Sequence, residues 1–434
     1  MTAVGADPYV PGHGDRRFAV RDYHLELDYK VTTNHLRGVA TLEVVIEQAT
    51  TSIELDLYGL TVTRVLVDGR APRRFSHRDR RLRIDLAAAA VPGTQLRVDV
   101  LYAGKPRPIP SVFGPVGWEE LTDGVLVAAQ PCGAPSWFPC NDRPDDKARY
   151  RIDVTASEAY RVVANGVLDG RDRRAGRITW RYRQEQPMAP YLAVLHVGRY
   201  ATTPVAAGVE IIHPPGLRVG RGTAFARQAD MLSIFVEMFG PYPFDEYRAV
   251  ITADVLEIPL EAQSLTTFGA NHVVANWDNE RLVAHELAHQ WFGNSLTVRH
   301  WADIWLHEGF ACYSEWLWSE ASGGRSVQVL AAEHHRRLAA KPQDLVLGSP
   351  GRDLMFDDRV YKRGALALHA VRGVLGVRFF EMLRQWTADN RWGLVSTAAF
   401  TDHAQRYTDA DLTALIDTWV YSKPLPPIVA SAAR

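Results

Sequence analysis

The sequence predicts an α+β protein of two domains, a β-sheet domain followed by a mainly helical one. Three observations predict it. Short stretches of alternating polar and apolar residues fill the N-terminal half, apolar residues at helical spacing dominate the C-terminal half, and a chain of 434 residues is long enough for two domains. The character of the sequence changes near residue 204, so we expect domains over residues 1–204 and 205–434.

The N-terminal half has the pattern of an antiparallel sheet. Residues 24–31 alternate polar and apolar side chains, and turn signals such as Asp68-Gly69 separate this stretch from similar ones. Such alternation is typical of antiparallel sheets with one face in water. A stretch rich in Pro and Gly, 104–117, is expected to form a long surface loop. Further strands are expected over 52–57, 81–86, 96–100, 150–155 and 191–197.

Helical patterns prevail from residue 223 onward. Residues 223–239 place apolar side chains at helical spacing, and Gly240-Pro241 is a stop signal for that helix. A strand is expected over 248–254. Further helices are expected around the two segments 285–292 and 305–310 described below, and then over 325–340, 361–375, 378–388 and 411–420.

The composition excludes several classes of protein. The formal net charge is −1, so neither a nucleic acid nor an anionic membrane is expected as a partner. No run of eighteen apolar residues indicates a membrane span, and residues 1–17 contain no apolar signal-peptide core. Cys132, Cys140 and Cys312 are too few for a disulfide framework. We expect a cytoplasmic location.

The stretch His285-Glu286-Leu287-Ala288-His289, together with Glu308, predicts a catalytic zinc site. Residues four apart share one face of a helix, so both imidazoles can reach one metal ion. Glu286 lies about 100° round the helix from His285, where a general base for water must stand. Glu308 supplies a third ligand, and three protein ligands leave one tetrahedral position open, as catalytic zinc requires.

The alternative interpretation is a solvated helix with two unrelated histidines. The flanking residues argue against it, because 282–284 and Trp291-Phe292 are apolar and place this helix in a core. Buried histidines need a partner, and a metal ion provides one. Ligand histidines usually donate their second nitrogen to a carboxylate or carbonyl, for which Asp303 and Glu315 are candidates. An oxyanion donor is also needed, but chemistry alone does not choose among the 16 tyrosines.

Several longer segments make the chain similar to a known family. It resembles the gluzincin aminopeptidases of peptidase family M1, the group that includes aminopeptidase N and leukotriene hydrolase. The segments are HELAHQWFGN at 285–294, WLHEGFA at 305–311, VYKRGA at 360–365, FPCNDRP at 138–144, FGPYPFDEY at 239–247 and DTWVYSKPLP at 417–426.

The resemblance implies a fold, a cofactor and further site residues. It implies an N-terminal β-sheet saddle, a thermolysin-like catalytic domain and one Zn²⁺ per chain. Tyr361 then corresponds to the tyrosine that stabilises the oxyanion. Glu261 corresponds to the acid that binds the substrate α-amine, and it alone is retained from the family motif Gly-x-Met-Glu-Asn. Gln130 is the candidate for a second contact to the amine or to the first side chain.

Two departures from the family pattern carry expectations of their own. His307 stands where the family usually has Asn, and we expect it in the second shell or on the surface, not as a fourth ligand. The sequence ends soon after Pro427, so the resemblance implies a short form without the C-terminal helical domain and with a more open cleft.

The function expected from these residues is zinc-dependent aminopeptidase activity on peptides with a free N-terminus. A zinc endopeptidase or an epoxide hydrolase on the same site remains an alternative, as does an inactive family member that acts as a binding scaffold. The preferred first residue and the oligomeric state stay open.

Overall fold

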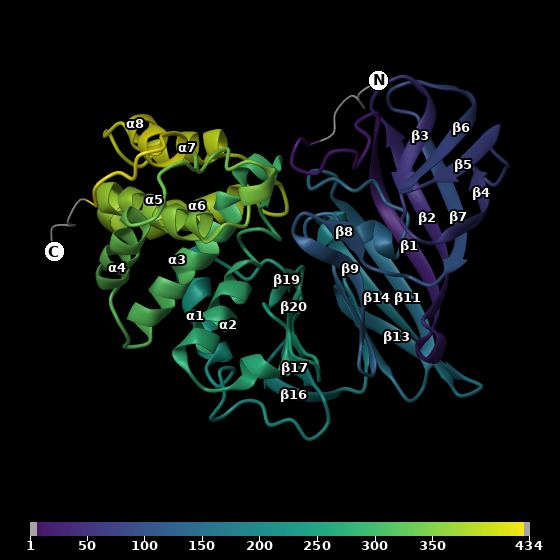
Figure 1. The fold of residues 1–434 in the computed structure, drawn as a ribbon, viewed down its shortest axis with the longest axis horizontal. Coiled ribbons are helices and arrows are strands. Elements are labelled where there is room, and N and C mark those ends of the chain that lie inside the picture. Colours follow the sequence, from purple (N-terminus) through teal and green to yellow (C-terminus); the bar gives the residue numbers. More distant parts are fainter. Residues whose placement is uncertain (1–6, 429–434) are drawn as a thin grey trace.

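The chain forms a β domain and a helical domain that lie side by side, as the α+β prediction requires (Figure 1). The computed structural model describes residues 7–428. The first two hundred residues contain strands and only short 3₁₀ turns, and all eight α-helices of the described residues follow. The predicted fold class is confirmed.

Three sheets build the β domain. The largest has the order β13-β14-β11-β1-β2-β7-β4, with bounds Val167–Arg174, Arg177–Met188, Ala148–Ser157, Phe18–Lys30, His35–Ile46, Gln95–Gly104 and Thr61–Val67. The second has the order β12-β15-β10-β9-β8, with bounds Arg161–Ala164, Leu195–Gly198, Gly124–Ala128, Gly114–Leu121 and Ile109–Ser111. The third has the order β3-β6-β5, with bounds Thr50–Asp56, Arg81–Ala90 and Arg74–Arg78.

The alternating pattern of the sequence sets the faces of these sheets. In β1, Leu25 and Leu27 are buried while Glu26 is exposed, which is the expected consequence of a two-residue repeat. The pairing is antiparallel throughout the largest sheet except between β1 and β11, which run parallel. The sheet is therefore mixed. Strand β11 follows the strands β3 to β10 along the chain, several of which belong to the other two sheets, before it pairs in parallel with β1.

The surface loop expected over 104–117 is wrong in part. That stretch contains β8 and the first half of β9, and Ile109 and Val116 are buried. Pro110 is tolerated because β8 is the edge strand of its sheet, where a missing N–H breaks no ladder. The apolar residues in this stretch are too widely spaced to have indicated a strand.

A five-stranded sheet and the helices make up the second domain. The sheet has the order β16-β17-β18-β20-β19, with bounds Ala201–Ala206, Val209–His213, Tyr247–Ile251, Leu265–Phe268 and Leu260–Ala262. A small parallel pair joins β21, Thr297–Val298, to β22, Leu394–Val395. The helices are α1 Gln228–Phe239, α2 Trp277–Ala288, α3 Trp305–Ala321, α4 Val327–Ala339, α5 Asp358–Leu375, α6 Phe379–Asp389, α7 Thr397–Gln405 and α8 Leu412–Ile416. Residue 204 falls inside β16, and the boundary near it stays a prediction.

Several element bounds differ from those expected. Helix α1 begins at Gln228 and not at 223, because Thr223 closes a turn by donating its hydroxyl to the Gly220 carbonyl. The strand expected over 191–197 begins only at Leu195, after a 3₁₀ turn. Helix α7 was not expected, although Ser396 caps it by accepting from the Ala399 N–H. Strands β19 and β20 were also missed.

Contacts made by Asp7, Tyr9 and Lys147 are among those that join the two domains. The Asp7 carboxylate accepts a hydrogen bond from the Trp301 N–H at 2.9 Å, and the Tyr9 hydroxyl accepts one from the Gly351 N–H at 3.1 Å. Lys147 of the β domain reaches the helical domain with its ammonium group. That Nζ donates to the carbonyls of Asn294, Ser295 and Gly393 at 3.1, 2.9 and 3.5 Å.

None of the helices within residues 7–428 is long and apolar enough to cross a lipid bilayer. The three cysteines are buried and free, so Cys132 and Cys140 form no disulfide.

Replacing Lys147 by Met should weaken the attachment of the two domains. The substitution leaves three carbonyls without their donor, and loss of a partner at a buried polar group costs about 1–3 kcal/mol. We expect a free energy of unfolding lower by about that amount, measured as a reduced midpoint in thermal melts. Lys105→Met is the control, because Lys105 is exposed in the same domain. Equal midpoints for the two variants would contradict the expectation.

Candidate active site

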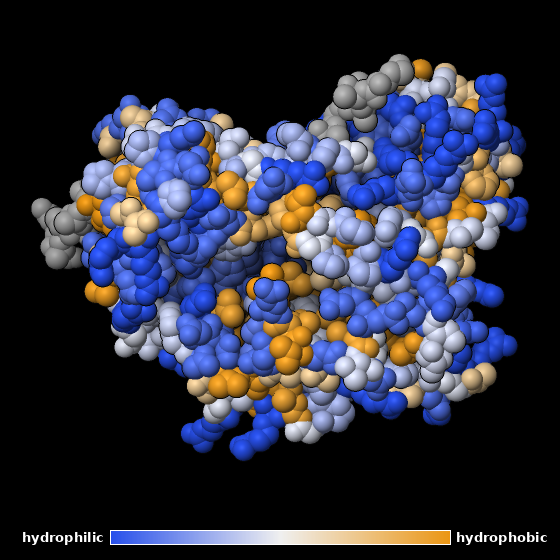
Figure 2. All heavy atoms as spheres, in the orientation of Figure 1, coloured by the Kyte–Doolittle hydropathy of each residue, from blue (hydrophilic) through white to orange (hydrophobic). Residues whose placement is uncertain are grey.

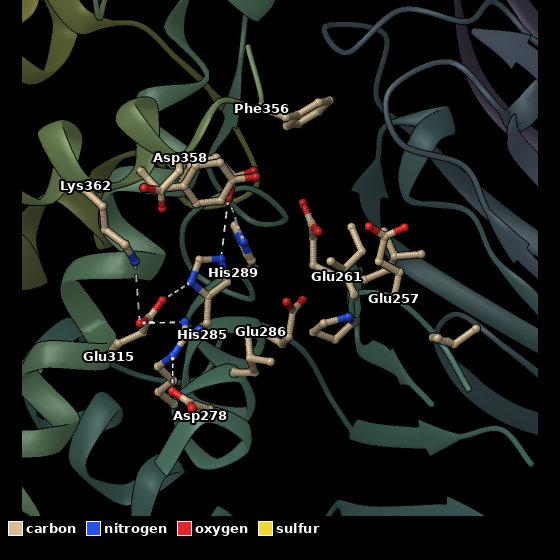
Figure 3. A pocket seen from close by; sticks show the side chains of 18 of the residues that line it. Glu257, Glu261, Asp278, His285, Glu286, His289, Glu315, Phe356, Asp358 and Lys362 are labelled. Atoms are coloured by element: carbon tan, nitrogen blue, oxygen red, sulfur yellow. Dashed lines mark hydrogen bonds and ion pairs between the residues drawn. The ribbon is translucent and has the colours of Figure 1, made fainter. Parts of the chain in front are cut away.

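A cavity of about 1230 Å³ lies between the two domains. Figure 2 shows it as a recess between the lobes, and Figure 3 shows the side chains that line it. One wall comes from β9, β10 and the segment 255–261, and the other comes from α2, α3, α4 and the start of α5. All residues that the sequence predicted for catalysis, metal binding or substrate binding line this cavity.

Helix α2 presents His285 and His289 on one side. Its start is fixed by Asn276, whose side chain accepts from the Asn279 N–H. Each imidazole is oriented by a hydrogen bond at Nδ1. His285 Nδ1 lies 2.8 Å from Glu315 Oε1, and His289 Nδ1 lies 3.0 Å from the Phe292 carbonyl oxygen. With Nδ1 protonated and engaged in this way, both Nε2 atoms are free to bind a metal ion.

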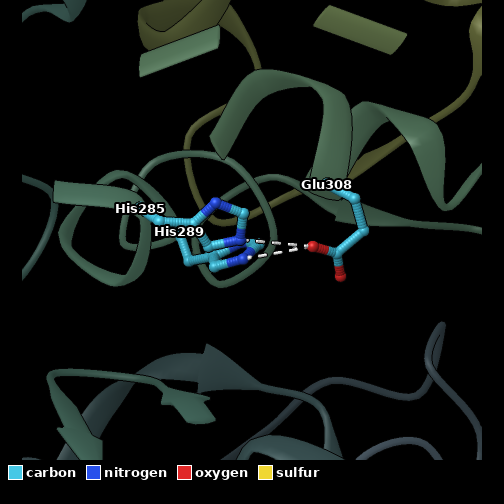
Figure 4. Close-up of side chains that lie close together, drawn as sticks. All are labelled: His285, His289 and Glu308. Carbon is cyan, nitrogen blue, oxygen red and sulfur yellow. Dashed lines mark ion pairs between the residues drawn. The ribbon is translucent and has the colours of Figure 1, made fainter. Parts of the chain in front are cut away.

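Glu308 on α3 faces both Nε2 atoms (Figure 4). Its Oε2 lies 3.5 Å from Nε2 of His285 and 3.5 Å from Nε2 of His289. Tetrahedral zinc with ligand distances near 2.05 Å separates its ligand atoms by about 3.3 Å. The three buried side chains therefore fit a zinc ion in spacing and in chemistry.

The electrostatics of the three residues suit a cation as well. Burial alone would raise the pKa of the Glu308 carboxyl, but His289 and His285 hold that pKa well below its usual range. An ionised carboxylate between two imidazole nitrogens is a ready ligand for a divalent ion.

Glu286 lies next to this group but not in it. Burial raises the pKa of its carboxyl to about 8, although the neighbouring histidines act to lower it. Its Oε2 has no hydrogen-bond partner and only 4 % of the residue is exposed. The Oε2 atom can therefore accept a hydrogen bond or a proton from a molecule that enters the cavity.

Tyr361 comes from α5 and is brought to the site by close packing of α5 on α3. A Cβ added to Gly309 would lie 2.8 Å from the Cα of Gly364, so only glycines allow this approach. The Tyr361 ring stacks on the His285 ring, with centroids 6.0 Å apart and planes 20° apart. Burial raises the pKa of its hydroxyl well above the usual value, so it stays a proton donor.

Glu315, two turns after Glu308 on α3, is the carboxylate that orients His285. Besides that imidazole it binds Arg281 at 3.2 Å and lies 4.0 Å from the Lys362 ammonium. Burial would raise its pKa, but Lys362, His285 and Arg281 lower the pKa to about 2. Asp303 and Glu315 were the two carboxylates that the sequence offered as partners for a ligand histidine. Of these, Glu315 contacts His285.

Asp303 and His307 have structural roles instead. The Asp303 carboxylate accepts hydrogen bonds from the hydroxyl and N–H of Thr397. His307 is fully buried, and its Nε2 accepts from the Val298 N–H at 2.9 Å. It lies neither on the surface nor in the group of three presumptive ligands.

Glu261 and Gln130 meet across the boundary between the domains. Gln130 Nε2 donates to Glu261 Oε1 at 2.6 Å. Glu261 lies in β19, and burial is the main cause that raises the pKa of its carboxyl. Together they form a polar pair in the cavity that also contains His285, His289 and Glu308.

The contact of Phe113 with Phe356 was not expected from the sequence. Their rings meet edge to face with centroids 5.1 Å apart, and they join the β8–β9 turn to the segment before α5 at the rim of the cavity. No local pattern could have indicated it, because the two residues are far apart in sequence and each is a single aromatic in an irregular segment.

A β domain followed by a helical domain with an HExxH helix and a downstream glutamate defines a class of metallopeptidases. The sequence model described as the Peptidase M1 N-terminal domain matches residues 20–192, and the Peptidase family M1 domain matches residues 223–419. The chain belongs to peptidase family M1.

Curated relatives are similar over much of the chain at modest identity. The leucyl aminopeptidase of Saccharolobus solfataricus is 23% identical over 94% of this chain, and the chain covers 54% of that protein. Aminopeptidase M1-A of Oryza sativa is 29% identical over 60% of this chain, which covers 32% of it. The chain thus spans about half or less of the length of these relatives.

Solved structures are similar to nearly the whole of this chain. The M1 zinc metallopeptidase of Deinococcus radiodurans is 31% identical, with a TM-score of 0.88 over 98% of this chain and 99% of that one. A mutant of that metallopeptidase has been solved with a Tyr-Ser-Ala substrate. Yeast LTA4 hydrolase, at 19% identity and a TM-score of 0.82, shares the fold.

Removing the charge of Glu315 should weaken metal binding. In Glu315→Gln, His285 loses the carboxylate that holds its ring and raises its basicity, a loss worth about 10- to 100-fold in metal affinity. Competition with a chelator of known affinity measures it. Glu320→Gln, on the same helix but away from His285, is the control. Unchanged affinity in the first variant, or an equal loss in the control, would argue against this role.

Proposed function

We propose that this chain is a zinc-dependent aminopeptidase that hydrolyses the first peptide bond of peptides with a free N-terminus. The observation that supports it most is the hydrogen bond between Gln130 and Glu261, because a buried carboxylate in the same cavity as three potential zinc ligands is suited to bind an ammonium group. The family of the chain, and relatives named aminopeptidases, agree with this proposal.

His285, His289 and Glu308 would hold the zinc ion. Zinc bound by these three side chains would act as a Lewis acid toward water and the scissile carbonyl. Glu315 and the Phe292 carbonyl would keep the two imidazoles in the tautomer that directs Nε2 at the ion.

Glu286 would serve as the general base and then as the general acid. Its unpaired Oε2 faces the cavity, where it can accept a proton from water and pass that proton to the leaving amine. Burial raises the pKa of this carboxyl above its usual range, which favours retention of the proton between the two transfers.

Tyr361 would donate a hydrogen bond to the oxyanion. Its hydroxyl stays protonated because burial raises its pKa, and its position against the His285 ring brings it beside the metal site. A buried, preoriented donor stabilises developing negative charge without any reorganisation of solvent.

Glu261 would bind the substrate's α-ammonium group, with Gln130 fixing the carboxylate. Within residues 7–428 the side-chain hydrogen-bond partner of this buried carboxylate is a neutral amide, so the carboxylate is suited to pair with a cation. An amine held there sets the distance to the scissile bond, so that a single residue is removed at each turnover.

Location and assembly stay predictions. The composition favours the cytoplasm, since cysteine is scarce and the three thiols are buried and unpaired. The oligomeric state is open.

Glu286→Gln should abolish hydrolysis while leaving the metal in place. Loss of general acid–base catalysis costs about 10²- to 10⁴-fold in kcat. A panel of aminoacyl chromogenic amides measures the rate, and bound zinc is measured on the same samples as the control. Activity that persists in this variant would refute the proposal. The activity would then come from a contaminating enzyme, and the chain itself would be an inactive scaffold.

Acetylating the α-amine of the substrate should remove the activity. The acetylated amide has no cation for Glu261, and the burial of that carboxylate then opposes binding. Equal rates on free and acetylated substrates would indicate an endopeptidase instead. Turnover of an epoxide without turnover of any amide would indicate the hydrolase alternative.

Tyr361→Phe should lower kcat by about 10²- to 10³-fold with little change in KM, because the hydroxyl contributes only when negative charge develops. Steady-state kinetics on one free-amine substrate measure both constants. A rise in KM with unchanged kcat would show that Tyr361 binds the substrate and does not support the oxyanion.

A further inference from the structure

The segment that follows α2 is bound to the strand that carries Glu261. Just beyond His289, the side-chain amides of Gln290 and Asn294 both reach the backbone of β19. Gln290 Nε2 donates to the Ala262 carbonyl at 3.0 Å, and Asn294 Nδ2 donates to the same carbonyl at 2.9 Å. A carbonyl oxygen has two lone pairs, so these two amides fill the hydrogen-bonding capacity of the Ala262 oxygen.

Gln290 also supports the turn that follows Ala262. Its Oε1 accepts a hydrogen bond from the Ser264 N–H at 2.9 Å, so one amide bridges an acceptor and a donor of the β19–β20 turn. An N–H can only donate and a carbonyl can only accept, so the partners settle the orientation of this amide. Ser264 has a φ of 66°, a left-handed conformation that a non-glycine residue keeps only where its surroundings hold it.

These amides take the place of a neighbouring strand. Strand β19 is the edge strand of its sheet, next to β20. Ala262 is 1 % exposed, and Gln290 and Asn294 are fully buried. A buried carbonyl is costly to leave without a donor, so the strand is held where the two amides meet it.

The strand held in this way brings Glu261 to the metal site. One carboxylate oxygen of Glu261 lies within 4.8 Å of a ring nitrogen of His289. Ala262 follows Glu261 in the chain. Gln290 follows His289, so a single hydrogen bond joins the residues next to the two functional groups. A displacement of about 1 Å between groups that act on one substrate can lower a rate about 100-fold.

The β domain holds the turn of this hairpin and not the Ala262 carbonyl. Asn165 Nδ2 donates to the Gln263 carbonyl at 2.8 Å, and the Gly166 N–H donates to Ser264 Oγ at 2.8 Å. These two contacts set where the hairpin lies against the β domain. The contacts at Ala262 link the hairpin to the metal-binding helix.

We propose that Gln290 and Asn294 are positioning residues that set the distance between Glu261 and the metal site. The inference rests on the proposed function, in which Glu261 binds the α-ammonium group and zinc acts on the carbonyl of the same substrate residue. Both amides act through Ala262, whose carbonyl they hold. They keep the amine-binding carboxylate at the separation from the metal that one amino-acid residue spans.

A pair of small ligands measures this distance without catalysis. Alanine hydroxamate carries a free amine and a zinc-chelating group, whereas propionohydroxamate has the same chelating group and lacks the amine. In the zinc-loaded protein we expect the amine to lower Kd by about 10- to 100-fold, the range for a hydrogen bond to a charged group. Isothermal titration calorimetry measures both constants, and their ratio reports the contribution of the amine.

Gln290→Met and Asn294→Ala should each lower that ratio by about tenfold, while the Kd of propionohydroxamate stays nearly the same. Methionine has nearly the size of glutamine but cannot donate to Ala262. Asn294→Ala keeps the backbone carbonyl that Lys147 binds, and it answers the same question should Gln290→Met fail to fold.

Gln405→Met is the matched control. The Gln405 amide also bridges backbone groups, because it donates to the carbonyls of Thr408 and Ala410 and accepts from the Leu412 N–H. It lies at the end of α7 and does not line the cavity. The control should keep the full ratio of the two dissociation constants.

The outcomes separate this inference from the proposed function. A ratio that survives in both variants overturns the inference, and so does an equal weakening of both hydroxamates, which would indicate a general loss of structure. In either case, a high ratio in the unmodified protein keeps Glu261 as the amine site and the proposed function with it. Equal binding of the two hydroxamates by the unmodified protein would mean that the amine is not bound, and both proposals would then fail.

Discussion

The contact of α2 with α3 through buried histidines and carboxylates is the constraint on which the site depends. Two glutamates of α3, Glu308 and Glu315, face the same His285 from different sides, one at Nε2 and the other at Nδ1. Neither carboxylate could stay ionised at this depth without the histidines and the cations Arg281 and Lys362. The helices are therefore held in one register by charge as well as by apolar packing.

Close packing then adds the remaining groups to this pair of helices. The approach of Gly309 to Gly364 brings α5 against α3, so the Tyr361 ring stacks on the His285 ring and Lys362 lies near Glu315, the carboxylate that binds His285. Phe292 and Phe310 stack with ring centroids 4.1 Å apart, which fixes the turn after His289. The positions of the charged groups in the site are therefore set by the packing of uncharged aromatic rings and glycines.

The fold class and the centre of the site could be predicted from the sequence because both depend on short-range periodicity. The two-residue repeat of β1 and the four-residue spacing of His285 and His289 each lie within one strand or helix. The geometry of that element alone decides which side chains share a face. The surface loop predicted around Pro110 was wrong because its residues are buried through pairing of β8 with β9, which the local sequence pattern does not reveal. The contacts of Lys147 and of Phe113 join residues more than one hundred positions apart, and single-residue signals of this kind are invisible without the tertiary structure.

The hydrogen bond from Gln130 to Glu261 connects the two domains. Its donor follows the end of β10 in one domain and its acceptor belongs to β19 in the other, and at 2.6 Å it is a short hydrogen bond. The amine site proposed for this pair therefore depends on how the two domains are aligned. Small rotations between the halves would alter selectivity for the chain end before they disturbed the metal-binding helices, which lie wholly within one of them.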